Sequence, residues 1–242
     1  MNTNYTIKKI NDLHSLFQGF RSHSGFGFWF RGQANSEWKL IPKAGRPEFY
    51  LPQNRDLGRF NAWSDHAIAY TPLPDHEIER LALAQHHGLA TRLLDWTMNP
   101  LVATYFACEF EPSTNGAIFI LETPEELANQ TTDITTLSKT NGIYGYIPKA
   151  IAPRVINQKG VFTIHCDAAT EITQKQSTRF PETNILKKIT IPANLKTEIS
   201  AHLLDYGIDK SYLFPDIDGL SAHINNLTLR IKKRQHPKHF TT

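Results

Sequence analysis

The chain has 242 residues, of which 40% are hydrophobic and 20% are charged, a balance that is typical of a folded globular protein and excludes a disordered one. Its formal net charge of +3 is too small an excess to indicate a nucleic-acid-binding protein by itself. No apolar run approaches the length of a membrane span, and residues 1–4 lack the pattern of a signal peptide, so we expect a cytoplasmic protein.

The first part of the chain predicts a helix, a strand and a long irregular stretch. Residues 7–19 carry isoleucine and leucine at helical spacing and end at a glycine, which predicts an amphipathic helix. The compact apolar run at residues 28–30 predicts a buried strand. Residues 42–74 are rich in proline, glycine and asparagine and are expected to be largely irregular, with a helix compatible with residues 60–70.

Two helices are predicted in the middle of the chain. Residues 75–87 are expected to form the first, because Asp75 suits an N-cap and Gly88 suits a C-terminal stop. Asn99 and Pro100 favour the start of the second, since proline at the first helical position leaves no amide unpaired. The apolar run that follows predicts that this helix is largely buried.

The later part of the chain predicts three strands and two amphipathic helices. The strands are expected at residues 116–121, 160–165 and 185–191, and the helices at residues 192–206 and 216–230. The polar residues 123–140 favour a loop or a short helix. Together the elements predict a single α+β domain with a mixed or antiparallel central sheet flanked by helices, its core extending over about residues 5–230.

The cysteines and the basic end of the chain indicate little specific chemistry. Cys108 and Cys166 lie in apolar or strand-like contexts without the spacing of metal ligands, so we expect buried reduced thiols and no metal site. Residues 231–242 are rich in lysine, arginine and histidine. A flexible solvated tail explains this basic end, and an arm that binds nucleic-acid phosphates is the alternative.

Arg31 follows the strand predicted at residues 28–30, the kind of strand end at which binding sites commonly lie. Gly32 beside it allows a ligand or a backbone segment to approach closely. The guanidinium can bind a phosphate or a carboxylate, or it can tie the strand to a carboxylate of the protein such as Asp95. In either case we expect Arg31 to line the main pocket, because a buried unpaired charge is costly.

Residues 85–97 hold the densest group of polar side chains that can take part in catalysis. His86 and His87 are adjacent on the predicted helix and point about 100° apart, so at most one is expected to face a given pocket and they do not form a metal pair. Both helix faces are apolar, so periodicity does not choose between them. Because His87 is closer to the polar turn, we expect it to reach the pocket beside Arg31, with His86 or Gln85 packed under the turn.

A turn between two helices is expected to contain Thr91, Arg92, Asp95 and Trp96. Arg92 and Asp95 can form a salt bridge that holds this turn together. Trp96 can belong to the core or stack on a base or a nicotinamide ring. Thr91 suits a helix cap.

Four segments together resemble the FRG domain, a family of bacterial and phage proteins named for a Phe-Arg-Gly motif. They are Phe30-Arg31-Gly32-Gln33, residues 85–97 with 99–101 and 105–107, Gln158-x-Gly160-x-Phe162, and residues 213–220. The four segments cover most of the chain, and their combination is more specific than any one of them. One departure is Ala90, which stands where the family motif has proline, a change expected to loosen the turn slightly.

The order of these segments is similar to that of the ADP-ribosyltransferases, and this resemblance implies a similar fold and NAD as the substrate. It also implies a toxin or effector in phage–host or defence biology. Arg31 would hold the pyrophosphate or the nicotinamide ribose, His86 or His87 would hold a ribose hydroxyl, and an aromatic ring would stack on the nicotinamide. The implied catalytic residues are Arg31, His86, His87, Asp95 and Gln158. The implied NAD-binding residues are Gln33, Thr91, Arg92, Trp96 and Tyr105.

The expected reaction needs a carboxylate, because ribosyl transfer passes through an oxocarbenium-like transition state that a carboxylate stabilises. Which residue supplies this carboxylate is left open. The position that corresponds to this carboxylate is Gln158, whose amide supplies no negative charge. Asp95 is the first alternative and Glu182 the second. If no acid serves, the same pocket is expected to bind a nucleotide, a nucleic acid or a protein partner without catalysis. A metal-independent nuclease that uses His and Arg is a third hypothesis.

Overall fold

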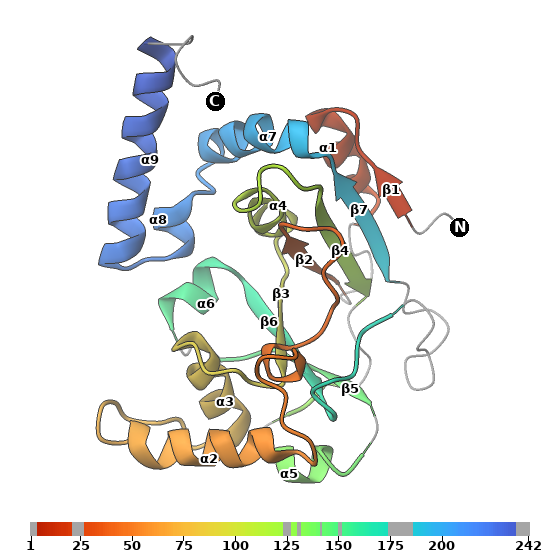
Figure 1. Ribbon diagram of the computed structural model, residues 1–242, viewed down its shortest axis with the longest axis vertical. Helices are drawn as coiled ribbons and strands as arrows, with labels where there is room; N and C mark the ends of the chain where they lie inside the picture. Colours follow the sequence, from red (N-terminus) through yellow and green to blue (C-terminus); the bar gives the residue numbers. More distant parts are fainter. Residues whose placement is uncertain are drawn as a thin grey trace.

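The computed structural model describes residues 4–20, 27–122, 127–129, 132–140, 142–149, 152–173 and 186–235. Within this part of the chain, one seven-stranded sheet has the order β1-β7-β4-β2-β3-β6-β5 (Figure 1). Its strands are β1 (Asn4–Thr6), β2 (Phe28–Gln33), β3 (Leu93–Thr97), β4 (Gly116–Glu122), β5 (Ile143–Tyr146), β6 (Gly160–His165) and β7 (Lys187–Ile191). β1 is parallel to β7 and the other neighbours are antiparallel, so the prediction of an α+β domain with a mixed sheet is confirmed.

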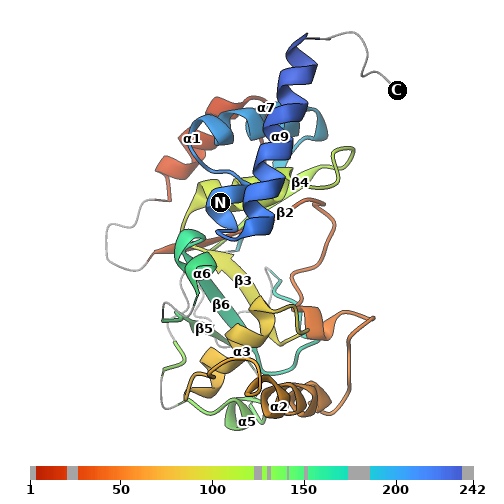
Figure 2. The same cartoon turned by 90° about the vertical axis from the view of Figure 1, so that its left-hand side faces the viewer.

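Helices gather at the two ends of the sheet (Figures 1 and 2). They are α1 (Ile10–Gln18), α2 (Arg55–Ala67), α3 (Glu77–His86), α4 (Pro100–Cys108), α5 (Ile134–Leu137), α6 (Pro153–Asn157), α7 (Ala193–Asp205), α8 (Lys210–Leu213) and α9 (Ile217–Gln235), with a 3-10 helix η1 (Lys43–Gly45). α1, α4 and α7 lie beside the β4 and β7 end, whereas α2, α3 and α5 lie beside the β5 and β6 end. None of the described helices is long and apolar enough to cross a membrane.

The sheet is weakly joined at its centre. β2 pairs with β4 over its whole length, but its described pairing with β3 is limited to Phe30 and Thr97. On either side of this join a separate apolar core is packed, one around α4 and α7 and the other around α2 and α3. A third cluster crosses the join and includes Trp29 from β2 with Leu94 and Trp96 from β3. The two halves of the sheet are therefore held together largely by side chains.

Gly32 permits the close packing of α4 against β2. A Cβ atom at this position would lie 1.8 Å from the carbonyl oxygen of Ala103, which belongs to α4. No side chain can be accommodated there without displacing the helix backbone. The sequence allowed either a ligand or a backbone segment to approach Gly32 closely. In the structure it is the backbone of α4 that does so.

Most of the predicted helices and strands are confirmed, with shifts of a few residues at their ends. Asn99 caps α4 as expected, and its side chain accepts a hydrogen bond from the amide of Leu101 at 3.0 Å. Gly88 follows α3 with a φ of 92°, a left-handed conformation that suits the glycine stop predicted there. Cys108 and Cys166 are buried free thiols, also as predicted.

The largest error in the predicted elements concerns β3. We expected this stretch to be a turn between two helices, but it pairs with β6 from Leu93 to Thr97. Leu93, Leu94 and Trp96 are all buried, so the strand has apolar residues on both faces and lacks a simple alternation of polar and apolar positions. β1, β5, α6 and α8 were also not predicted, because each is only three to five residues long.

The chain end also differs from the expectation in part. α9 continues to Gln235, beyond residue 230, where the predicted helix and core ended. The first residues of the expected basic tail are therefore helical. Residues 236–242 lie outside the described part of the chain, as does the strand residue predicted at 185.

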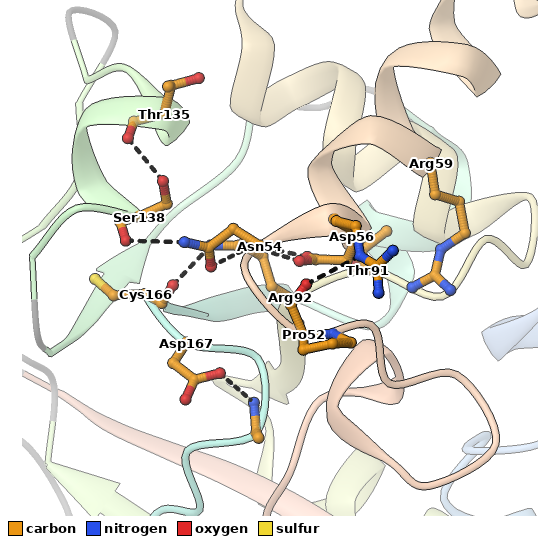
Figure 3. A network of polar contacts seen from close by, with 12 residues as sticks. Pro52, Asn54, Asp56, Arg59, Thr91, Arg92, Thr135, Ser138, Cys166 and Asp167 are labelled. Atoms are coloured by element: carbon orange, nitrogen blue, oxygen red, sulfur yellow. Dashed lines mark hydrogen bonds and ion pairs between the residues drawn. The ribbon is translucent and has the colours of Figure 1, made fainter.

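Arg92 lies at the centre of a buried polar network (Figure 3). Its Nε and Nη2 atoms donate to the two carboxylate oxygens of Asp56 at 2.9 and 2.6 Å. The same guanidinium donates to the carbonyl oxygen of Cys166 at 2.7 Å and to the side chain of Asn54 at 3.2 Å. The predicted salt bridge from Arg92 to Asp95 is therefore wrong. Instead, Arg92 ties the start of α2 to the segments that flank β3 and β6.

Removing the carboxylate partner of Arg92 is expected to destabilise the whole domain. Asp56→Ala would leave a fully buried guanidinium without its counter-charge, so we expect the free energy of unfolding to fall by about 3–5 kcal/mol. Asp65→Ala on the exposed side of the same helix should change it by less than about 0.5 kcal/mol. Urea unfolding measures the free energy of unfolding of both variants. An equal decrease in the two would show that the buried ion pair contributes no more to stability than an exposed carboxylate does.

His165 forms a second buried network, behind β3. Its Nδ1 donates to the carbonyl oxygen of Thr170 at 2.7 Å, so Nε2 is the acceptor and faces the hydroxyl of Thr163 at 3.2 Å. That hydroxyl in turn accepts a hydrogen bond from the indole Nε1 of Trp96 at 3.1 Å. Burial disfavours the charged ring and lowers the pKa of His165 to about 4; the hydrogen bond to Thr170 raises this pKa in part, and the charges of Arg31 and Arg92 lower it further.

The neutral His165 ring should make the fold sensitive to acid. The His165 ring is protonated near pH 6.5 in the unfolded chain but only near pH 4 in the folded chain. The contribution of the neutral ring to the free energy of unfolding is therefore complete above pH 6.5 and is lost as the pH falls toward 4. We expect the difference in unfolding free energy between the wild type and His165→Gln to shrink across this interval. The exposed His66→Gln variant is the matched control, and a difference that stays constant with pH would contradict the assignment.

Candidate functional site

A cavity of about 350 Å³ opens where β2 and β3 separate, a volume within the range of small-molecule sites. Its walls come from β2, η1, the end of α3, β3, α4, α6 and β6. The charged residues among its lining are Arg31, Lys43, Arg46, Asp95 and Arg154. The lining of the pocket therefore contains one carboxylate and four cationic side chains.

Arg31 spans the gap between the two halves of the sheet. Its Nη1 donates to the main-chain carbonyl of Asp95 at 2.7 Å and lies 3.8 Å from the carboxylate Oδ2. As predicted, Arg31 lines a pocket together with residues of the 85–97 segment and faces Asp95. Burial lowers the pKa of Arg31 to about 10, with Asp95 raising it and Arg46 lowering it, so the guanidinium remains charged at neutral pH.

Asp95 is held from α3 by a chain of hydrogen bonds. Its Oδ1 accepts from Nε2 of Gln85 at 2.6 Å, and the amide oxygen of Gln85 accepts from the hydroxyl of Thr91. The side chain of Asp95 is still 64% exposed. Gln85 and Thr91 thus orient this carboxylate toward the open pocket, and Thr91 contributes without lining the cavity itself.

The other three cations approach from two separate segments. Lys43 and Arg46 lie on and just after η1, and Nζ of Lys43 donates to the carbonyl of Gly88 at 3.1 Å. Arg154 comes from α6, where its guanidinium lies 4.3 Å from the centre of the Phe214 ring. None of these three residues was predicted to belong to a site. Their only sequence signal was positive charge, which does not distinguish a pocket from the surface.

His86 lines the pocket, whereas His87 is exposed and lines a separate apolar hollow beside α2. Our expectation that His87 reaches the pocket was wrong, because α3 ends at His86 and the backbone turns away at His87. The two rings contact each other edge to face, 5.0 Å apart. Burial, Arg154 and His87 lower the pKa of His86, and Asp216 raises it in part, so His86 is neutral at neutral pH.

Part of the pocket lies in a segment of the chain that matches a known protein family. Residues 27–116 match the FRG domain, a stretch that runs from the start of β2 to the start of β4. The chain is an FRG domain-containing protein. Comparison with curated proteins and with solved structures gives no match.

Within the matched FRG segment lie Arg31, His86 and Asp95, together with Lys43 of η1 and Arg46 just after it. α6, which supplies Arg154, and Gln158, which follows it, lie outside this segment. Gln158 lines the pocket, but its amide nitrogen donates to the carbonyl of Leu213 at 3.0 Å and so ties α6 to α8. The pocket of this FRG protein is therefore completed by residues beyond the matched segment.

Four residues that were predicted to bind NAD have no exposed polar group or ring in the pocket. Arg92 is fully buried in its network with Asp56, and Gln33 is buried outside the lining. The Trp96 ring is 3% exposed and belongs to the core, so it offers no face for stacking. Tyr105 also lies outside the lining, and burial and Glu109 raise the pKa of its hydroxyl far above its usual range.

An aromatic wall is nevertheless present. Phe106, the neighbour of Tyr105 on α4, lines the pocket and packs edge to face against Phe214 at 6.3 Å. Among the described residues, no three His, Cys, Asp or Glu side chains are grouped to hold a metal ion. Glu182, the second candidate for a catalytic acid, lies outside the described residues.

The pH dependence of anion binding can show which of the two adjacent histidines, His86 or His87, lines the pocket. His86 is neutral until the pH falls below its ordinary pKa of 6.5, and its protonation then adds a fifth positive charge to the pocket. We expect sulfate, whose own charge is constant in this range, to bind several-fold more tightly as the pH falls through and below 6.5. Titration calorimetry measures this effect.

The matched variants are His86→Gln and His87→Gln. The first should lose the increase in sulfate affinity at low pH, because no ring remains to be protonated in the pocket. The second should retain it, since His87 faces the hollow beside α2. The reverse result would assign the pocket histidine to position 87.

Proposed function

We propose that the pocket binds NAD and that the protein cleaves the bond between nicotinamide and ribose, passing the ADP-ribose group to an acceptor or to water. The observation that carries this proposal is that Arg31, Lys43, Arg46 and Arg154 line one cavity together with the carboxylate of Asp95. Cations suit the pyrophosphate, and a carboxylate suits the ribosyl cation that develops during cleavage.

Pyrophosphate binding is assigned to the mouth formed by β2 and η1. Arg31 has one hydrogen bond to the protein through Nη1, while its buried Nε has no partner among the described residues. Because that Nε is also closed to solvent, a ligand oxygen can reach the Arg31 guanidinium only through its Nη atoms. Lys43 and Arg46 add two further charges from the neighbouring segment. An anion with several oxygens matches this distribution better than a single carboxylate does.

Cleavage is assigned to the side of the pocket near Asp95. As the N-glycosidic bond breaks, nicotinamide leaves with the electron pair and positive charge builds on the ribose, where the Asp95 carboxylate stabilises it. Gln85 fixes the orientation of this carboxylate from α3. The neutral His86 ring can bond a ribose hydroxyl, and Phe106 provides an apolar surface for the departing ring. An enzyme of this kind would act as a toxin or effector, because it would consume NAD or attach ADP-ribose to an acceptor.

A second candidate function is binding of a nucleotide without cleavage. The exposure of Asp95 favours it, because water screens a carboxylate that is 64% exposed and weakens its effect on a developing charge. The cationic groups would bind phosphates in the same way under both hypotheses. Turnover, rather than binding, therefore separates the two functions.

The test is to measure nicotinamide release from NAD by the purified protein, with and without cell extract as acceptor, and NAD binding by calorimetry. We expect Asp95→Asn to lower the rate of release at least about 100-fold with little change in NAD affinity. Arg31→Lys should weaken NAD binding about tenfold, because lysine keeps the charge and loses the planar fork.

The exposed substitutions Asp205→Asn and Arg55→Lys are the matched controls and should behave as the wild type does. NAD binding that depends on Arg31 without nicotinamide release would support the second candidate. Failure of the wild-type protein to bind NAD, with all variants folded, would overturn the first proposal, and failure to bind any nucleotide would overturn the second.

A further inference from the structure

α9 presents an apolar stripe to the solvent. Ile217, Leu220 and Ile224 are 74%, 48% and 53% exposed, and Leu227 continues the stripe as a half-buried residue. Their spacing of three, four and three residues is the heptad pattern of a helix that packs along another helix. In the sequence, Ile231 repeats the spacing once more. A regular apolar stripe on an exposed helix is a feature of interaction surfaces.

The position of α9 leaves this stripe accessible. In both views the helix extends beyond the body of the molecule, and its base is joined to α8 (Figures 1 and 2). Near the base, His223 lies 3.4 Å from Asp209 and so faces the body of the protein. Among the described residues, no segment covers Ile217, Leu220 or Ile224.

We propose that α9 pairs with α9 of a second copy of this chain, and that the two helices are antiparallel. The charges along the helix select this arrangement. Asp216 and Asp218 lie at its exposed start, whereas the sequence of its last turns contains Arg230, Lys232, Lys233 and Arg234.

An antiparallel pair places the acidic start of each helix beside the basic end of the other and aligns the helix dipoles favourably. A parallel pair would place the two basic ends together. The apolar residues then meet along the shared seam, where they are removed from water. The seam spans only about two heptads, so the dimer is expected to be reversible and dependent on protein concentration.

The experiment is sedimentation equilibrium of the full chain over a range of protein concentrations. The wild type should change from monomer to dimer as concentration rises. Ile224→Glu, which places a charge in the middle of the seam, should raise the dissociation constant at least 100-fold. Asn226→Glu adds the same charge two residues away, at an exposed position on the side of α9 opposite the apolar stripe, and should leave the dimer unchanged. Circular dichroism and melting temperature confirm that both variants are folded.

Salt tests the orientation. Increasing salt should weaken an antiparallel dimer several-fold, because it screens the attraction between the acidic and basic ends. It would strengthen a parallel dimer, in which like charges meet. A wild-type chain that remains monomeric at all accessible concentrations, an Ile224→Glu variant that dimerises normally, or a dimer that salt strengthens would each overturn the proposal.

Discussion

The guanidinium of Arg92 is fully buried, and the carboxylate that neutralises it comes from Asp56, 36 residues earlier in the chain. A buried charge of this kind requires both a counter-charge and hydrogen bonds for its remaining donors, and here Asn54 and the carbonyl of Cys166 supply them. Because Arg92 immediately precedes β3, this network sets where the strand begins. Asp95, three residues later, is placed in the pocket as a consequence.

The pocket exists because the sheet is incomplete between β2 and β3. A continuous ladder between the two strands would close the space that Arg31 now spans. The core cluster around Trp29 and Trp96 holds the strands together on one face, so the other face can remain open without separating the halves. The far wall depends on α6, because Asn157 at its end and Gln158 just after it donate to main-chain carbonyls of α8 at 2.7 and 3.0 Å. The C-terminal helices therefore support a pocket that they do not line.

The success of the sequence-based predictions followed the strength of the local signals. Asn99 followed by Pro100 is a helix start in almost any context, and Gly88 is a helix stop, so α3 and α4 were predicted near their observed bounds. β3 was missed because its burial on both faces removes the alternation by which strands are recognised. The choice between His86 and His87 failed for a related reason. Both lie on apolar faces of α3, and the direction of the backbone after the helix decides which ring enters the pocket.

By itself, the sequence determined the α+β class, most of the helices and strands, the buried thiols and the position of Arg31 opposite Asp95 in the pocket. These features depend on local propensity, periodicity and the type of side chain, all of which can be read along the chain. Only the tertiary structure decided that Arg92 is neutralised by Asp56, that Gln158 bonds to a carbonyl of α8, and that Lys43, Arg46 and Arg154 share one cavity. The physical reason is that a charged side chain has no preferred partner within its own segment. Its partner is whichever opposite charge or carbonyl the packing of distant elements brings within hydrogen-bond distance.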